Sequence, residues 1–104
     1  MFLLMNTSFV NGAIGTTFLN NVYLASLKVY KSDKVENGKI LAVTVKYDSD
    51  IRTEACFETV EIPVKSVYDN VDIITRLMIG LNKVPAKSVE AVNVDEILGD
   101  MIKK

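Results

Sequence analysis

Two Asn-Gly pairs, Asn11-Gly12 and Asn37-Gly38, are the strongest local constraint in this sequence. Asn-Gly is the pair that best fits a two-residue β-turn, because both turn residues need a positive φ angle. The second pair follows a short polar run and precedes the apolar run KILAVTVKY, whose faces alternate with the period of a strand. The two pairs therefore predict two β-hairpins.

A partner strand is predicted just before the second Asn-Gly pair, in the run NVYLASLKVY. A strict two-residue turn would mix the faces of these two strands. Matching the apolar faces instead places Val29 opposite Val45. It also places Lys28 opposite Lys46. This register requires a β-bulge or a longer loop within residues 31–36.

A third strand is predicted around Val60, Ile62 and Val64, which alternate with other residues. Pro63 cannot donate a backbone hydrogen bond, so this segment is expected at a sheet edge or to end there.

The apolar spacing changes to that of a helix after Ser66, and Pro85 ends the run. Ser66 and Asp69 together predict a capping box. The helix is expected to lie on the sheet through one apolar stripe, formed by Val67, Val71, Ile74, Met78 and Leu81.

A short strand within residues 87–94 and a C-terminal helix capped by Asn93 and Glu96 complete the chain. The sequence thus predicts one α+β domain over residues 1–104, with an antiparallel sheet or small, partly open barrel of about five strands. The element order over residues 21–94 is similar to that of oligonucleotide/oligosaccharide-binding barrels, in which a helix follows the third strand. Here a helix replaces the last strand of that pattern.

The residue types available argue against an enzyme, and no cofactor or metal is expected. The sequence has no histidine and a single cysteine, Cys56, which removes the common general base, nucleophile pairs and zinc sites. The segment GAIGTT lacks the lysine of a phosphate-binding loop. Asp48, Asp50 and Glu54 lie close together without the spacing of a calcium loop, so a solvated turn is expected.

No charged residue occurs before Lys28. An uncharged stretch of that length is expected to be buried in its own core or against a partner, because unprotected apolar strands invite pairing with another chain. We therefore expect a non-enzymatic protein that binds other proteins and associates with itself, of the kind that phages or mobile elements encode to bind a host or partner protein. The expected interface residues are Phe2, Leu4, Phe9, Val10, Ile14 and Phe18.

The alternative is binding of single-stranded nucleic acid by the second hairpin, which has a local net charge of +3 in a chain of −1. Lysines beside a tyrosine on a sheet face combine phosphate contacts with base stacking. The residues expected to bind in this alternative are Lys28, Tyr30, Lys31, Lys34 and Lys46. The same lysines could instead keep a sheet edge soluble.

The single cysteine indicates a reducing, cytoplasmic setting. The N-terminal run MFLLM lacks the positive charge and the length of a signal peptide, and no run is long enough to span a membrane. We expect no membrane contact.

Overall fold

The computed structural model describes residues 1–47, 56–85 and 90–104. In chain order, its elements are β1 (Phe2–Val10), β2 (Ala13–Leu19), β3 (Val22–Tyr30), β4 (Gly38–Tyr47), β5 (Phe57–Lys65), α1 (Asn70–Asn82), β6 (Ala91–Asn93), α2 (Val94–Leu98) and the short 3-10 helix Gly99–Met101.

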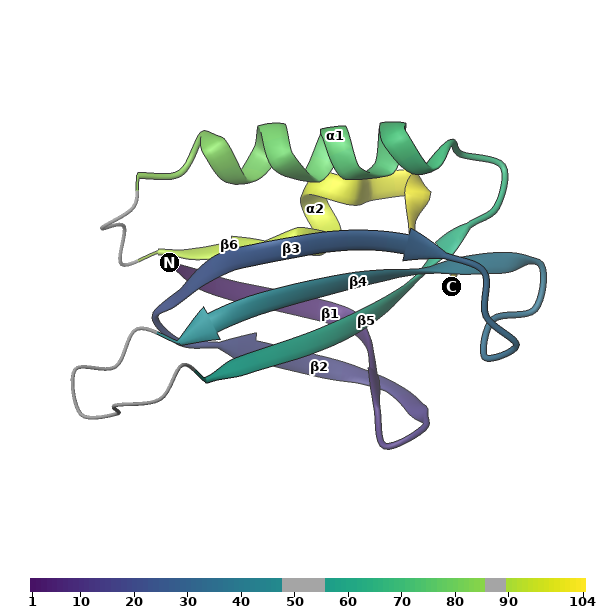
Figure 1. Cartoon of the computed structure of the whole chain (residues 1–104), viewed down its shortest axis with the longest axis horizontal. Coiled ribbons are helices and arrows are strands. Elements are labelled where there is room, and N and C mark those ends of the chain that lie inside the picture. Colours follow the sequence, from purple (N-terminus) through teal and green to yellow (C-terminus); the bar gives the residue numbers. More distant parts are fainter. Residues whose placement is uncertain (48–55, 86–89) are drawn as a thin grey trace.

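The strands form two three-stranded sheets. Sheet A has the order β2-β1-β6 and sheet B the order β3-β4-β5, and the described strands do not close into a barrel. Every pairing is antiparallel except that of β6 with β1. In Figure 1, α1 lies along one side of the molecule and α2 lies between it and the strands. This arrangement confirms the predicted α+β fold, with a helix after the central strands and a short helix at the C-terminus.

One apolar core is shared by both sheets and both helices. Its buried side chains come from every element, and the largest include Leu3, Met5, Leu41, Ile62, Leu77 and Leu98. Backbone bonds between Met1 and Val22 join the start of β1 to the start of β3, at 2.8 Å and 2.9 Å. At the other end, the Lys103 amide donates to the Pro63 carbonyl at 3.0 Å.

The first Asn-Gly pair forms the predicted tight turn. Asn11 and Gly12 have φ angles of 51° and 84°, and Val10 pairs directly with Ala13 across them. Both positive angles are those that a type I′ turn requires. The N-terminal hairpin prediction is therefore confirmed.

The predicted register of the second hairpin was wrong by four residues. Val29 pairs with Leu41 and Lys28 with Ala42, whereas Lys46 pairs with Tyr23. The connection is a loop over residues 31–37, in which Val35 folds inward and is buried. A β-bulge is present, but it lies in β3 between Leu24 and Ser26. Because a shift of four residues preserves the alternation, Leu27 and Val29 lie on the core face as predicted. N-terminal to the bulge the prediction was wrong, because Leu24 lies on the core face and Tyr23 on the outer face.

The prediction for α1 also needs correction. The buried residues of the helix are Ile73, Leu77 and Leu81, whereas Val67 and Val71 are 80% and 69% exposed. Met78 is exposed as well. The described structure contains no Ser66–Asp69 capping box, because the Ser66 hydroxyl donates to the Asn37 carbonyl at 3.1 Å instead.

Two local predictions near the C-terminal half are confirmed. Asn93 caps α2, with its side-chain oxygen accepting from the amides of Asp95 at 3.0 Å and Glu96 at 3.4 Å. Pro63 lies in β5, which is an edge strand of sheet B.

Candidate interaction surface

The outer face of the β1–β2 hairpin gathers large apolar side chains. Leu4 pairs with Phe18 and Phe9 with Ile14, and side chains of directly paired residues project to the same side of a sheet. The rings of Phe2 and Phe18 are stacked with centroids 6.2 Å apart. We call this surface the hairpin face; its residues are Phe2, Leu4, Phe9, Ile14 and Phe18.

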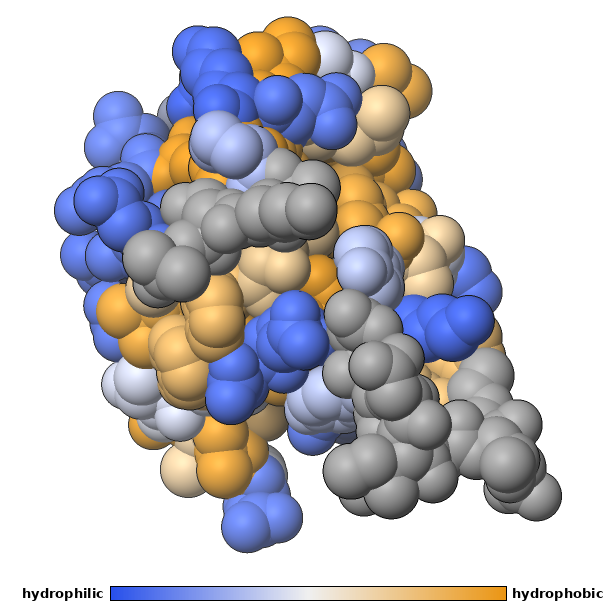
Figure 2. All heavy atoms as spheres, turned by 90° about the vertical axis from the view of Figure 1, so that its left-hand side faces the viewer, coloured by the Kyte–Doolittle hydropathy of each residue, from blue (hydrophilic) through white to orange (hydrophobic). Residues whose placement is uncertain are grey.

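The hairpin face contains five of the six residues predicted for an interface. Ile14 and Phe18 are each 54% exposed, and the other three are half-buried. Val10 is the exception, because it follows Phe9 and projects to the opposite side, where Gly15 lies next to it. Figure 2 shows one end of the molecule, where hydrophobic residues reach the surface between hydrophilic ones.

The hairpin is held firmly from its inner side. The buried Ser8 hydroxyl lies 2.8 Å from that of Thr17 and donates to the Gly15 carbonyl at 3.1 Å. Asp95 of α2 accepts from the Asn6 amide at 2.7 Å and from the Thr7 hydroxyl at 2.8 Å. These bonds fix the hairpin against α2, so its outer face is a pre-organised surface.

The free edge of the hairpin is strand β2, which pairs with β1 and is outermost in sheet A. Its sequence, AIGTTFL, contains no charged residue and no proline. Edge strands of monomeric proteins usually carry lysine, proline or bulges that block pairing with another chain. Strand β2 has neither a lysine nor a proline. The bulge in its pairing with β1 lies in β1, which carries the extra residue.

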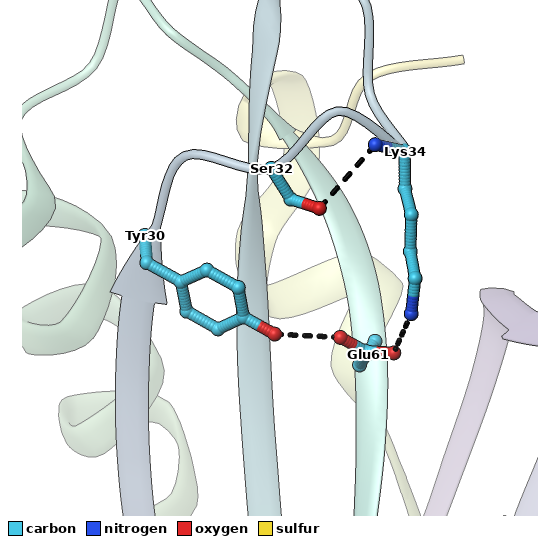
Figure 3. A network of polar contacts seen from close by, with 4 residues as sticks. All are labelled: Tyr30, Ser32, Lys34 and Glu61. Carbon is cyan, nitrogen blue, oxygen red and sulfur yellow. Dashed lines mark hydrogen bonds and ion pairs between the residues drawn. The ribbon is translucent and has the colours of Figure 1, made fainter.

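Two of the residues predicted for nucleic-acid binding, Tyr30 and Lys34, contact a carboxylate on sheet B. The Tyr30 hydroxyl donates to Glu61 at 2.6 Å, and the Lys34 ammonium lies 3.0 Å from the other oxygen of that carboxylate. Figure 3 shows the side chains of Tyr30 and Lys34 both directed at Glu61. Tyr30 and Lys34, two of the residues expected to contact nucleic acid, are thus bound to Glu61.

The network shifts two pKa values. The hydrogen bond from Tyr30, followed by that from Lys34, lowers the pKa of Glu61 from its ordinary value. The same bond to Glu61 raises the pKa of Tyr30, because the phenolate would lose it.

The other predicted lysines are dispersed. Lys28 and Lys46 share the outer face of sheet B but are not opposite each other, and Lys31 lies in the loop after β3. The observed register instead forms a row that sequence reasoning missed, with Lys46 between Tyr23 and Phe57. The aromatic residues are 51% and 57% exposed. The row depends on the bulge in β3, so the correct loop length and bulge position would have been needed to find it.

An open groove of about 720 Å³ runs between α1 and α2. Asp72, Arg76 and Lys83 lie along its α1 side, and Ile97 of α2 contributes to its apolar wall. Arg76 donates weakly to the Leu98 carbonyl across it at 3.4 Å. The groove holds charges of both signs and does not point to one ligand.

Comparison with protein-family models, with curated proteins and with solved structures gives no match to this chain. Within the described ranges, no helix has the length and apolar character to cross a membrane. In the same part of the chain, no three His, Cys, Asp or Glu residues are grouped to hold a metal ion. The Asp48, Asp50 and Glu54 cluster lies outside the described residues.

Proposed function

We propose that this protein is a non-enzymatic binding protein that acts through protein–protein contacts at the hairpin face and associates with itself. One observation carries the proposal: the hairpin face presents five large apolar side chains beside an uncharged free strand edge. Such a surface is more typical of a binding site than of a monomer's solvated side.

Association would bury apolar side chains that are exposed in the single chain. Full burial of a phenylalanine or isoleucine side chain is worth about 1.5–3 kcal/mol. Ile14 and Phe18 are each 54% exposed in the single chain, so about half of that free energy is still to be gained when a partner binds. Because the hairpin is already fixed by Ser8 and Asp95, little ordering would oppose binding.

Light-scattering mass measurement tests this function. We expect the wild-type protein to have the mass of a defined oligomer, and Phe18→Asp to reduce it to that of one chain. Phe57→Asp is the matched control, because Phe57 is equally exposed but lies on the outer face of sheet B. A wild-type mass of one chain at every concentration, or equal effects of the two substitutions, would contradict the proposal.

A second candidate, binding of single-stranded nucleic acid, is favoured by the Tyr23–Lys46–Phe57 row. Two exposed aromatic rings beside a lysine match the stacking and phosphate contacts of single-strand binders. A fluorescent single-stranded DNA of about 20 nucleotides should then bind in low salt and dissociate as salt increases. Lys46→Glu should abolish binding, whereas Lys83→Glu on α1 should not. Absence of salt-sensitive binding excludes this candidate.

A further inference from the structure

The tight turn of the N-terminal hairpin determines which backbone groups of β2 face outward. In a two-residue hairpin, the residues that flank the turn, here Val10 and Ala13, exchange both hydrogen bonds. Hydrogen-bonded positions then alternate along β2. The amides and carbonyls of Ile14, Thr16 and Phe18 therefore point away from β1, toward the free edge.

The side chains of the same three residues lie on one side of the sheet. Ile14 and Phe18 belong to the hairpin face, and Thr16 lies between them at the same parity and is exposed. A strand added to this edge would thus place its own side chains next to those of the hairpin face.

The edges of the other outer strands are less open to pairing with another chain, because contacts within this chain occupy part of them or because the strand is short. The β3 edge is met by Asn70, whose side-chain amide donates to the Val29 carbonyl at 3.4 Å. The β5 edge carries Pro63 and bonds the C-terminal segment through Val64–Ile102 and Lys103–Pro63 contacts. Strand β6 has three residues. The start of β3 also bonds Met1 through Val22. Among the described residues, no hydrogen bond reaches the outward backbone groups of β2.

We propose that a second copy of this chain pairs with β2 edge to edge, antiparallel, about a two-fold axis at Thr16. This inference rests on the self-association proposed above. Centring the axis on Thr16 pairs Ala13 with Leu19 of the second copy, so that the strand is matched over its whole length. The groups that point outward then face one another, with Thr16 opposite Thr16 and Ile14 opposite Phe18.

The chemistry of β2 fits a copy of itself. An isologous contact places the residue on the axis against its own copy, so a charge at that position would oppose a like charge, which is unfavourable. β2 has no charge to oppose. Each Phe18 would instead lie beside an Ile14, an aromatic and β-branched pair of the kind that stabilises adjacent strands. The two sheets A would become one continuous sheet with a doubled hairpin face.

Disulfide trapping tests the position of the axis. Directly opposed residues of a hydrogen-bonded pair have Cα atoms about 5.5 Å apart, within the range of a disulfide. In a Cys56→Ser background, Thr16→Cys should form a covalent dimer under mild oxidation. Ala13→Cys is the control, because two Ala13 residues would lie about 20 Å apart at opposite ends of the paired strands. Faster trapping of Ala13→Cys would overturn the proposed register.

A charge exchange at the same residue gives an independent test. Thr16→Lys and Thr16→Glu should each reduce the mass to that of one chain, and an equal mixture of the two should recover the dimer. Recovery would also show that both variants are folded. If the wild type is an oligomer that Phe18→Asp disrupts, but the Thr16 variants keep its mass, the register is wrong and the proposed function stands. A wild type of single-chain mass overturns both.

Discussion

Two glycines in Asn-Gly pairs serve different purposes in this structure. Gly12 has a φ angle of 84° and is needed for the turn itself. Gly38 does not have a positive φ angle, but a Cβ atom there would lie 2.5 Å from Val35 Cγ1 and 2.8 Å from the Val64 carbonyl oxygen. The second pair is therefore explained by the close approach of Gly38 to the loop and to β5, and the two strands are joined by a longer loop, as their apolar faces had required.

Gly38→Ala should lower the free energy of unfolding by about 2 kcal/mol, because the backbone carbonyl of Val64 cannot rotate away from an added methyl group. Gly15→Ala is the control. Its Cβ would lie 3.3 Å from Cγ2 of the exposed Val10 side chain, which can adjust, so a change within about 0.5 kcal/mol is expected. Urea unfolding measures both values. Equal losses would show that close packing at Gly38 is not the cause.

The Glu61 network predicts a dependence of stability on pH. Since the Tyr30 and Lys34 hydrogen bonds lower the pKa of Glu61 below 4.5, the carboxylate stabilises the folded state above that pH. The contribution is lost as pH falls through the lowered folded-state pKa. Glu61→Gln should therefore cost about 0.5 kcal/mol at neutral pH. The difference from wild type should disappear as the pH falls through this lowered pKa, because the carboxylate is then protonated.

Unfolding curves of the two proteins across this pH range test the sign of the effect. Glu58→Gln is a suitable comparison, because Glu58 is also on β5 and accepts from the Tyr47 hydroxyl. A Glu61→Gln penalty that persists at low pH would show that the loss comes from side-chain packing and not from the charge.

At the scale of elements, α1 shows why periodicity alone did not identify its buried side. The helix has apolar residues on more than one side, so the sequence contains two stripes at helical spacing. Gly80 identifies which stripe faces α2. A Cβ atom at this position would lie 2.6 Å from Ile97 Cγ2, so only glycine allows the two helices to approach this closely. The side of α1 near Gly80 is thus the one that packs on α2, and Leu77 is buried with it.

Leu77→Ala should cost about 3 kcal/mol of unfolding free energy, because it leaves a cavity in the shared core. Val71→Ala, on the stripe that the sequence favoured, should change stability by less than about 0.5 kcal/mol. Both values are measured by urea unfolding with far-UV circular dichroism. The reverse order would mean that the sequence-based stripe is the buried one.

The sequence predicted features that depend on neighbouring residues and failed for those that depend on distant ones. The alternation of β4, the Asn11-Gly12 turn and the Asn93 cap are local, and each was predicted correctly. Strand register depends on the conformation of the 31–37 loop and on the bulge in β3, which no local pattern specifies. Strand alternation alone places Phe2 with Leu4 and Ile14 with Phe18, whereas Phe9 joins this face only because of the irregularity in β1 between Met5 and Ser8. The Tyr23–Lys46–Phe57 row likewise required the register.

At the scale of the whole molecule, two separate sheets are united by a common core and by a few polar links. The backbone bonds between Met1 and Val22 join the two sheets. Asp95 attaches α2 to sheet A, since its carboxylate accepts from the Asn6 amide and the Thr7 hydroxyl of β1 while its own amide donates to the cap of α2. Because Leu3 and Val43 pack into one buried cluster, neither sheet is expected to open without the other.

Hydrogen exchange tests this coupling. The amides of Leu3 in β1 and Val43 in β4 lie in the central strands of their sheets, and both should exchange through one opening whose free energy equals that of global unfolding. Asp95→Ala leaves two donors of β1 without their acceptor, so it should reduce the protection of both amides equally, by about 2 kcal/mol. A loss confined to Leu3 would show that sheet A opens alone, and a hairpin that opens alone could not present a rigid face to a partner.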